Sequence, residues 1–365
     1  MMMAPRQNQS ILREVEMQVL VATKERQVFH AFGPRVEPLA VLDTRGIYEA
    51  LPKTQLAIVD DEDLIAHPFS VAFIRKLLEA APLRCCTSAE FLASPEAYLG
   101  ATAPLRDIYK PLPKRTIAFT SYSGGTGKTS FALDTALRLV NRSKRHLQLP
   151  VAVFEFTYGG SALGALLGEV KPYLYDLVVQ RELEPRCFQG ITLYPMDYEN
   201  VRLLSPEQVQ EYCHEQMTHH LLTIIDTIWP HGLASAIGNE VDLWVVLTTP
   251  RIDAIENATR LQQEITSTYG ENKAIIVVNQ MDGLASRLAL LGTRHDLEVP
   301  LIQRPEIFFD GRLGKEILSY TYGPQWREYQ KVRRPHWWSR RRHAGGRRQQ
   351  AAARLVSENP SLRSE

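Results

Sequence analysis

The sequence predicts an α/β protein whose main part is a mostly parallel, doubly wound sheet. Short runs of Val, Ile and Leu alternate with segments of helical spacing along most of the chain. Several runs are continuously apolar, as in strands that are buried on both faces of a sheet. A glycine-rich turn also joins one such run to a helical segment within residues 116–140.

Composition and the positions of prolines divide the chain into successive parts. Residues 1–15 lack the apolar core of a signal peptide, and we predict a disordered N-terminus. Residues 16–110 are expected to form a smaller α/β domain, and residues 111–115, with two prolines, a linker. The main domain is expected over 116–322, followed by a basic, irregular tail over 323–365.

The smaller domain combines β-rich runs with two helical patterns. Its expected strands are Gln18–Ala22, Leu39–Leu42, Gln55–Val59 and Leu83–Cys86, and its expected helices are Val71–Ala80 and Ala89–Tyr98. In the main domain the expected strands are Thr116–Thr120, Val151–Phe156, Ile191–Tyr194, Leu222–Ile225, Leu243–Thr248 and Ala274–Val278.

Composition excludes several classes of protein. The chain is 44% hydrophobic and 23% charged, which is ordinary for globular domains. No apolar run approaches the roughly 20 residues that a membrane-spanning helix needs. The four cysteines show neither metal-site nor disulfide-framework spacing, so we expect reduced thiols in a cytoplasmic protein.

The glycine-rich turn is the strongest functional signal in the sequence. A strand enters it and a helix leaves it, so its backbone amides and the helix N-terminus can converge on phosphate oxygens. Lys128 is expected to reach the β- and γ-phosphates, and the Thr129 hydroxyl to bind Mg²⁺. The predicted nucleotide-binding residues of the turn are Ser123, Gly124, Gly125, Thr126, Gly127, Lys128, Thr129 and Ser130.

The segment Ser123-Gly-Gly-Thr-Gly-Lys-Thr129 resembles the deviant Walker A motif of the MinD/ParA ATPases. Leu222–Thr227 resembles the family's Walker B strand, Val241–Pro250 the next strand, and Ile275–Asn279 the strand whose asparagine contacts adenine. The resemblance implies ATP and Mg²⁺ as cofactors and a nucleotide-dependent homodimer. It also implies that Asp226 holds Mg²⁺, through water, and that Asn279 contacts the base.

Two positions depart from the family pattern. Ser123 occupies the position of the family's signature lysine. Glu155-Phe-Thr157 aligns with the family's switch I motif, Asp-x-Asp. Thr157 therefore stands where the family has the aspartate that positions the attacking water. Since phosphoryl transfer depends on positioning and on charge neutralisation, we predict ATP binding with slow hydrolysis, with Lys128, Asp226 and Thr157 as catalytic residues.

The smaller domain is similar to a response-regulator receiver. Its strand Gln55–Val59 is followed by acidic residues, so a phosphoacceptor would be Asp60 or Asp61. The first strand, however, is followed by at most one acidic residue, Glu25, where a receiver needs a pair for Mg²⁺. We therefore expect a degenerate receiver-like domain that contacts a protein partner. A receiver-like domain before a deviant ATPase resembles the CpaE/TadZ pilus-assembly ATPases.

The tail carries nine Lys or Arg and no Asp or Glu between Lys331 and Arg354, together with Trp337 and Trp338. Such a segment suits an anionic membrane surface, while nucleic acid or a solubilising role are alternatives. The expected function is a nucleotide-dependent localisation or assembly factor for pilus or secretion-type machinery, cytoplasmic or peripheral at the inner face of the membrane. A DNA-partitioning ATPase of the ParA kind and a receiver-gated signalling ATPase are the alternatives.

Overall fold

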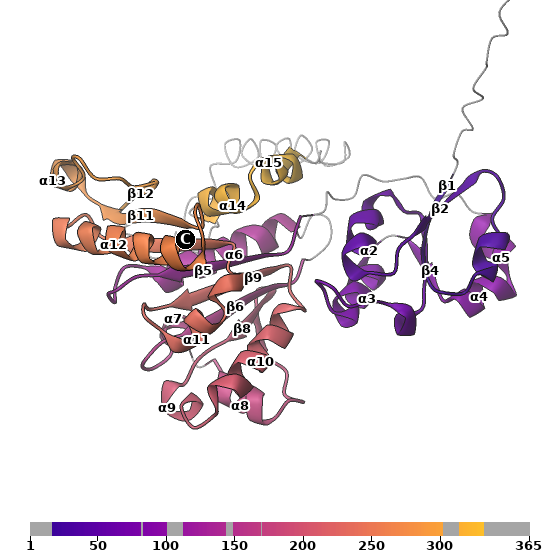
Figure 1. The fold of residues 1–365 in the computed structure, drawn as a ribbon, viewed down its shortest axis with the longest axis horizontal. Coiled ribbons are helices and arrows are strands. Elements are labelled where there is room, and N and C mark those ends of the chain that lie inside the picture. The colour runs from indigo at the N-terminus through magenta and orange to yellow at the C-terminus, as the bar shows by residue number, and fades with distance from the viewer. Residues whose placement is uncertain are drawn as a thin grey trace, which may run out of the picture. The chain divides into compact units, whose positions relative to one another are not determined.

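The computed structural model describes residues 17–81, 83–100, 112–143, 149–168, 170–301 and 314–331. It contains two separate sheets (Figure 1). The predicted disordered N-terminus and all of the tail beyond residue 331 lie outside the described residues.

The smaller sheet has four parallel strands in the order β2-β1-β3-β4. They are β1 Met17–Ala22, β2 Val36–Ala40, β3 Leu56–Val59 and β4 Arg84–Cys86. The helices of this part are α1 Gln27–His30, α2 Thr44–Ala50, α3 Val71–Ala80, α4 Ser88–Ala93 and α5 Pro95–Leu99. The single helix predicted over 89–98 is wrong, because Pro95 lacks a backbone N–H and begins a second helix after Ser94.

The larger sheet has eight strands in the order β12-β11-β10-β5-β9-β6-β8-β7, and only β7 runs antiparallel to its neighbour. The strands are β5 Arg115–Thr120, β6 Val151–Phe156, β7 Arg186–Phe188, β8 Ile191–Tyr194, β9 Leu222–Thr227, β10 Leu243–Thr248, β11 Ala274–Met281 and β12 Leu297–Pro300. The predicted fold class, a mostly parallel doubly wound sheet preceded by a smaller α/β domain, is confirmed.

Ten α-helices and one short 3-10 helix, Gly238–Glu240, among the described residues accompany this sheet (Figure 1). The α-helices are α6 Lys128–Ser143, α7 Ala162–Leu167, α8 Leu174–Val179, α9 Tyr198–Val201, α10 Pro206–Met217, α11 Gly232–Ala236, α12 Ile252–Tyr269, α13 Gly283–Ala289, α14 Gly314–Tyr322 and α15 Pro324–Lys331. Among the described helices, none is long and apolar enough to cross a bilayer.

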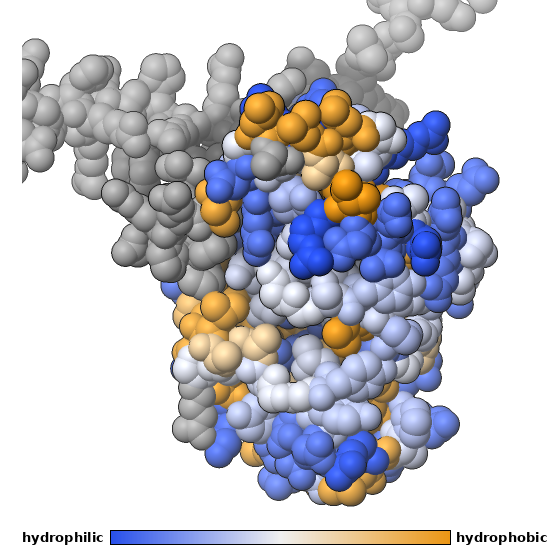
Figure 2. Space-filling view, turned by 90° about the vertical axis from the view of Figure 1, so that its left-hand side faces the viewer, coloured by the Kyte–Doolittle hydropathy of each residue, from blue (hydrophilic) through white to orange (hydrophobic). Residues whose placement is uncertain are grey.

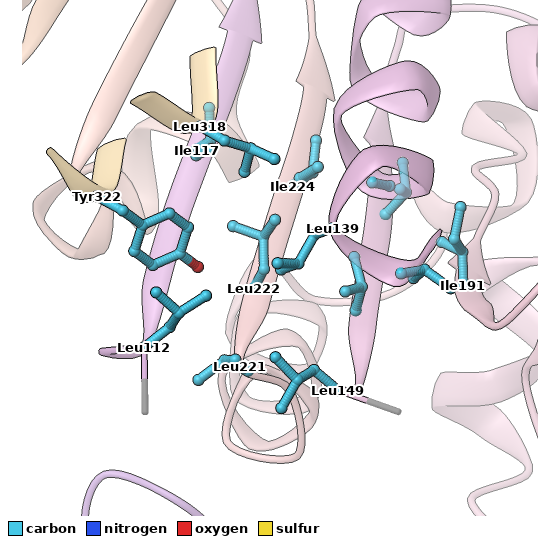
Figure 3. Packing of buried hydrophobic residues seen from close by; sticks show 14 of the residues in the cluster. Leu112, Ile117, Leu139, Leu149, Ile191, Leu221, Leu222, Ile224, Leu318 and Tyr322 are labelled. Atoms are coloured by element: carbon cyan, nitrogen blue, oxygen red, sulfur yellow. The ribbon is translucent and has the colours of Figure 1, made fainter. Parts of the chain in front are cut away.

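Both faces of the central strands are buried, which explains their continuous apolar sequence. Leu243, Val245 and Leu247 of β10 pack on the side of α6, whereas Trp244 and Val246 pack in the opposite layer. Figure 3 shows the first layer, where Leu139 of α6 lies over strand β9 and residues of α14 lie near β5. Phe131 and Ala132, near the start of α6, belong to the same layer and pack that end of the helix against the sheet.

The end of the main domain differs from the prediction. We expected an irregular tail from residue 323, but residues 324–331 form α15, and its Trp326 and Tyr329 are buried. Apart from these two aromatics, which are three residues apart, the helix is polar, so its sequence has too few apolar residues to stand out as a core helix. Burial of large aromatic rings therefore stabilises a helix that the pattern alone does not reveal.

Candidate nucleotide site

Three adjacent strands bring the predicted site residues to one edge of the larger sheet. β9 lies between β5 and β6, and the register pairs Asp226 with Phe119 on one side and with Glu155 on the other. Because parallel strands end at the same edge, the turn after β5, Asp226 and the loop after β6 meet there.

The turn after β5 has the backbone that its glycines permit. Gly125 and Gly127 have φ values of 73° and 91°, a region that residues with a Cβ rarely occupy. A Cβ on Gly127 would also lie 2.6 Å from Nδ2 of Asn279. The carbonyls of Thr126 and Gly125 accept hydrogen bonds from Asn279 Nδ2 at 2.9 Å and Gln280 Nε2 at 3.1 Å. Both carbonyls are thus held on the side of β11, the strand that carries Asn279 and Gln280.

Lys128, the first residue of α6, directs its ammonium group back over the turn. Nζ donates to Ser121 Oγ at 3.0 Å and to the Ser123 carbonyl at 3.1 Å. Burial lowers the pKa of Lys128, and the nearby carboxylate of Asp226 partly offsets this effect. A phosphate anion at this position would accept charge-assisted hydrogen bonds from the ammonium group.

Thr129 and Asp226 are in direct contact. Thr129 Oγ1 donates to Asp226 Oδ2 at 2.5 Å, while Asp226 Oδ1 is buried and has no hydrogen-bond partner among the described residues. Burial raises the pKa of Asp226 to about 7, and Glu155 adds to the increase. A hydroxyl beside a carboxylate with a spare oxygen is a donor set that suits Mg²⁺.

A cavity of about 510 Å³ lies between these groups, within the range of small-ligand sites. Thr157 and Lys128 both line it, and Thr157 Oγ1 is buried without a hydrogen-bond partner in the described part of the chain. The other lining residues are Gly124, Gly125, Gly127, Thr129, Ser130, Tyr158, Ala162, Asp226 and Ile228. The structure thus brings the three predicted catalytic residues to one cavity.

Asn279 lies behind the turn rather than at this cavity. Its amide nitrogen supports the loop through Thr126, and Asn279 is not among the residues that line the cavity. Ser123 lies on the other side of the loop, at a second cavity of about 570 Å³ with Tyr122 and the residues that follow β10. Contact of Asn279 with adenine stays a prediction.

Glu155 anchors the loop that carries Thr157. The fully buried carboxylate accepts hydrogen bonds from Ser161 Oγ and the Ala162 amide, both at 2.5 Å, and from the amides of Leu163 and Met196, both at 3.1 Å. Burial raises the pKa of Glu155, and these bonds partly offset the increase. Glu155 therefore fixes both ends of the segment 157–161 beside the cavity.

The sequence pattern missed a group that holds the same loop from its other side. His231 is 3% exposed. The centroid of its ring lies 5.8 Å from the ring centroid of Phe156 and 4.6 Å from that of Tyr158. Tyr158 also donates its hydroxyl to the Pro230 carbonyl at 2.8 Å. The signal available in the sequence was the aromatic cluster that closely follows Asp226 in Ile228-Trp-Pro-His231.

The acidic residues of the smaller domain are bound by protein donors. Asp61 accepts from Arg75 at 2.6 Å, and Asp63 lies 3.1 Å from Lys24 Nζ. Asp60 Oδ1 accepts from the Ser88 amide at 3.0 Å. Among the described residues, no group of three or more His, Cys, Asp or Glu could hold a metal ion.

Comparison with family models gives no match. An uncharacterized ATP-binding protein of Methanocaldococcus jannaschii is 26% identical over 198 residues, which cover 51% of this chain and 72% of that protein.

Solved structures give more distant likenesses. A ParA family ATPase from Chlorobium tepidum has a TM-score of 0.45 at 15% identity and covers 60% of this chain and 99% of its own. The septum site-determining protein MinD of Pyrococcus horikoshii, solved with Mg-ADP, has a TM-score of 0.44 at 16% identity and covers 60% and 93%. Scores below 0.5 assign neither family nor function, so the α/β assignment stands on the strand order and register.

Proposed function

We propose that this chain binds ATP with Mg²⁺ and hydrolyses it slowly. The observation that carries the proposal is the single cavity lined by Lys128, Thr129, Thr157 and Asp226. The backbone amides and Lys128 would hold the phosphates, and Thr129 with Asp226 would hold Mg²⁺. The name of the archaeal relative, an ATP-binding protein, supports the choice of nucleotide.

Mg²⁺ would supply charge neutralisation between the β- and γ-phosphates. The residues of the chain would do the rest. Lys128 would bind the phosphates, and Asp226 would accept a hydrogen bond from Thr129 or orient a water molecule. The Thr157 hydroxyl would orient the attacking water. A threonine cannot accept a proton as a carboxylate can, and Ser123 supplies no cation. Slow turnover is the expected consequence.

We further propose that the nucleotide state controls self-association, as part of a localisation or assembly factor for pilus or secretion-type machinery at the inner face of the membrane. The smaller domain would contact a protein partner, because its acidic residues are already bound to Arg75, Lys24 and Ser88. The tail would add contact with anionic lipid.

Light scattering after size-exclusion chromatography tests this switch. We expect the ATP-loaded chain to have about twice the mass of the nucleotide-free chain, and ADP to leave the mass unchanged. A Lys128→Ala variant should stay monomeric with ATP. Lys273→Ala, which removes an ammonium group that donates to the Asn239 carbonyl, should behave as wild type. An identical mass with and without ATP would count against the switch.

A further inference from the structure

Strand β11 is irregular where it passes the glycine-rich turn. Its register with β12 shifts between Val278 and Met281, so that Asn279 and Gln280 lie opposite a single residue of β12. Such a β-bulge is rare between parallel strands, and bulges are over-represented next to active sites, where they re-aim side chains. The bulge therefore makes Asn279 and Gln280 candidates for a role at the nucleotide site.

The backbone of Gln280 is strained. Its φ is 63°, in the left-handed region that residues with a Cβ rarely adopt. Among the described residues other than glycine, Gln189 and Asn272 also have a positive φ, but both lie between strands, whereas Gln280 lies within one. Strain of this kind persists where the surrounding contacts hold it, and it is concentrated at functional sites. The contacts of the Gln280 side chain show what holds it here.

The bulge directs two successive side chains to the same turn. In a regular strand, neighbouring side chains point to opposite faces. Here Asn279 Nδ2 donates to the Thr126 carbonyl at 2.9 Å, and Gln280 Nε2 donates to the Gly125 carbonyl at 3.1 Å. Consecutive amide side chains of β11 thus bind consecutive carbonyls of the glycine-rich turn.

These two hydrogen bonds orient two peptide groups of the turn. Both peptide bonds are trans, and in a planar trans peptide the N–H points opposite to the C=O. Because the carbonyls of Gly125 and Thr126 point to β11, the amides of Thr126 and Gly127 point away from it. Neither amide donates a hydrogen bond to another group in the part of the chain that the structure describes. Amides arranged in this way are the donors that bind phosphate in glycine-rich turns.

We propose that Asn279 and Gln280 are positioning residues that hold the glycine-rich turn in the conformation that binds phosphate. Each would act through a carbonyl of the turn, since neither lines the cavity that contains Lys128 and Thr129. The inference rests on the proposed binding of ATP and deepens it. It gives Gln280 a role in that binding, and it gives Asn279 a role that requires no contact with the base.

A bulge at this place could instead serve only to turn the chain out of the sheet. β11 leads directly into α13, whose Leu284 and Leu288 are exposed. Figure 2 shows apolar residues gathered at the top of the face on which Figure 1 places α13. A change of direction alone does not explain why two amide side chains bind consecutive carbonyls of one turn, so the hydrogen bonds favour the positioning role.

Calorimetric titration of the full-length chain with Mg²⁺ and either ATP or inorganic tripolyphosphate tests the proposal. Tripolyphosphate carries the phosphate chain without the base or the sugar. Asn279→Ala and Gln280→Ala should each bind both ligands about fivefold more weakly than wild type, the effect of one neutral hydrogen bond. The loss should be equal for the two ligands, because the variants disturb the turn and not a contact with the base.

Two further variants are the controls. Gln262 also donates its amide to a backbone carbonyl, that of Ala274 at the other end of β11, at 3.0 Å, and Gln262→Ala should bind both ligands as wild type does. Gln280→Gly separates support of the turn from folding. Glycine adopts a φ of 63° without strain, so this variant should melt at a higher temperature than Gln280→Ala. It should still bind both ligands about fivefold more weakly than wild type.

Wild-type affinity for tripolyphosphate in both alanine variants would overturn the proposal, and weaker binding of ATP alone would assign the two side chains to the nucleoside. Wild-type binding by Gln280→Gly would also overturn it, because the amide would then have no role. Wild type that binds neither ligand would instead refute the proposed ATP binding, and this inference with it.

Discussion

Lys128→Ala should weaken ATP binding about a hundredfold or more. In the structure its ammonium group lies 3.0 Å from Ser121 Oγ and 3.1 Å from the Ser123 carbonyl, at the wall of the cavity. Hydrogen bonds between charged groups contribute about 1.5–3 kcal/mol each, and the alanine variant would lose those made to the phosphates. Titration calorimetry with ATP and Mg²⁺ measures the change.

The matched control for this variant is Lys273→Ala, whose ammonium group lies near the Asn239 carbonyl and not at the cavity. It should bind ATP with wild-type affinity. Equal affinities of wild type and Lys128→Ala would show that the phosphates do not occupy the cavity beside α6.

Asp226→Asn should stabilise the nucleotide-free protein above pH 7. It should also abolish the effect of Mg²⁺ on ATP binding. Burial raises the pKa of Asp226 from 3.8 to about 7. Between these values the folded chain keeps a proton that the unfolded chain has released, so the free energy of unfolding falls as pH rises. Asparagine does not titrate, and the variant should gain on the order of 1–4 kcal/mol over wild type above that window.

Urea unfolding of both proteins at pH about 5 and about 8 measures this difference. The gain should be larger at the higher pH, and Asp253→Asn, at an exposed ion pair with Arg251, should show no such gain. Mg²⁺ should strengthen ATP binding to wild type and leave the Asp226→Asn variant unaffected. A variant that loses stability equally at both pH values would contradict a raised pKa for Asp226.

Central elements of the fold could be predicted because local pattern and burial agree. The strands Val151–Phe156, Ile191–Tyr194 and Leu243–Thr248 have the predicted bounds, since each is a short apolar run with turn residues at its ends. Edge elements were missed. The strand over 186–188 has three residues in a hairpin, and the strand over 297–300 carries a charge and a proline.

Within the site, the residues of the glycine-rich loop could be predicted from their spacing in the sequence, whereas contacts between distant residues could not. The glycine-rich motif already implied that Lys128 and Thr129 share a ligand. By contrast, the Met196 amide that binds Glu155 lies 41 positions away, and the aromatic contacts of His231 depend on the neighbouring strand β6. No local pattern encodes such partners, because they arise only when the sheet assembles.

Backbone amides and Lys128 at this turn are proposed to hold the phosphate groups of the nucleotide. Calorimetric titration of wild type with ATP, ADP, AMP and adenosine in the presence of Mg²⁺ tests this proposal most directly. We expect ATP and ADP to bind at least about a hundredfold more tightly than AMP, and adenosine to bind least. Similar affinities for all four, or no binding of ATP, would contradict the account.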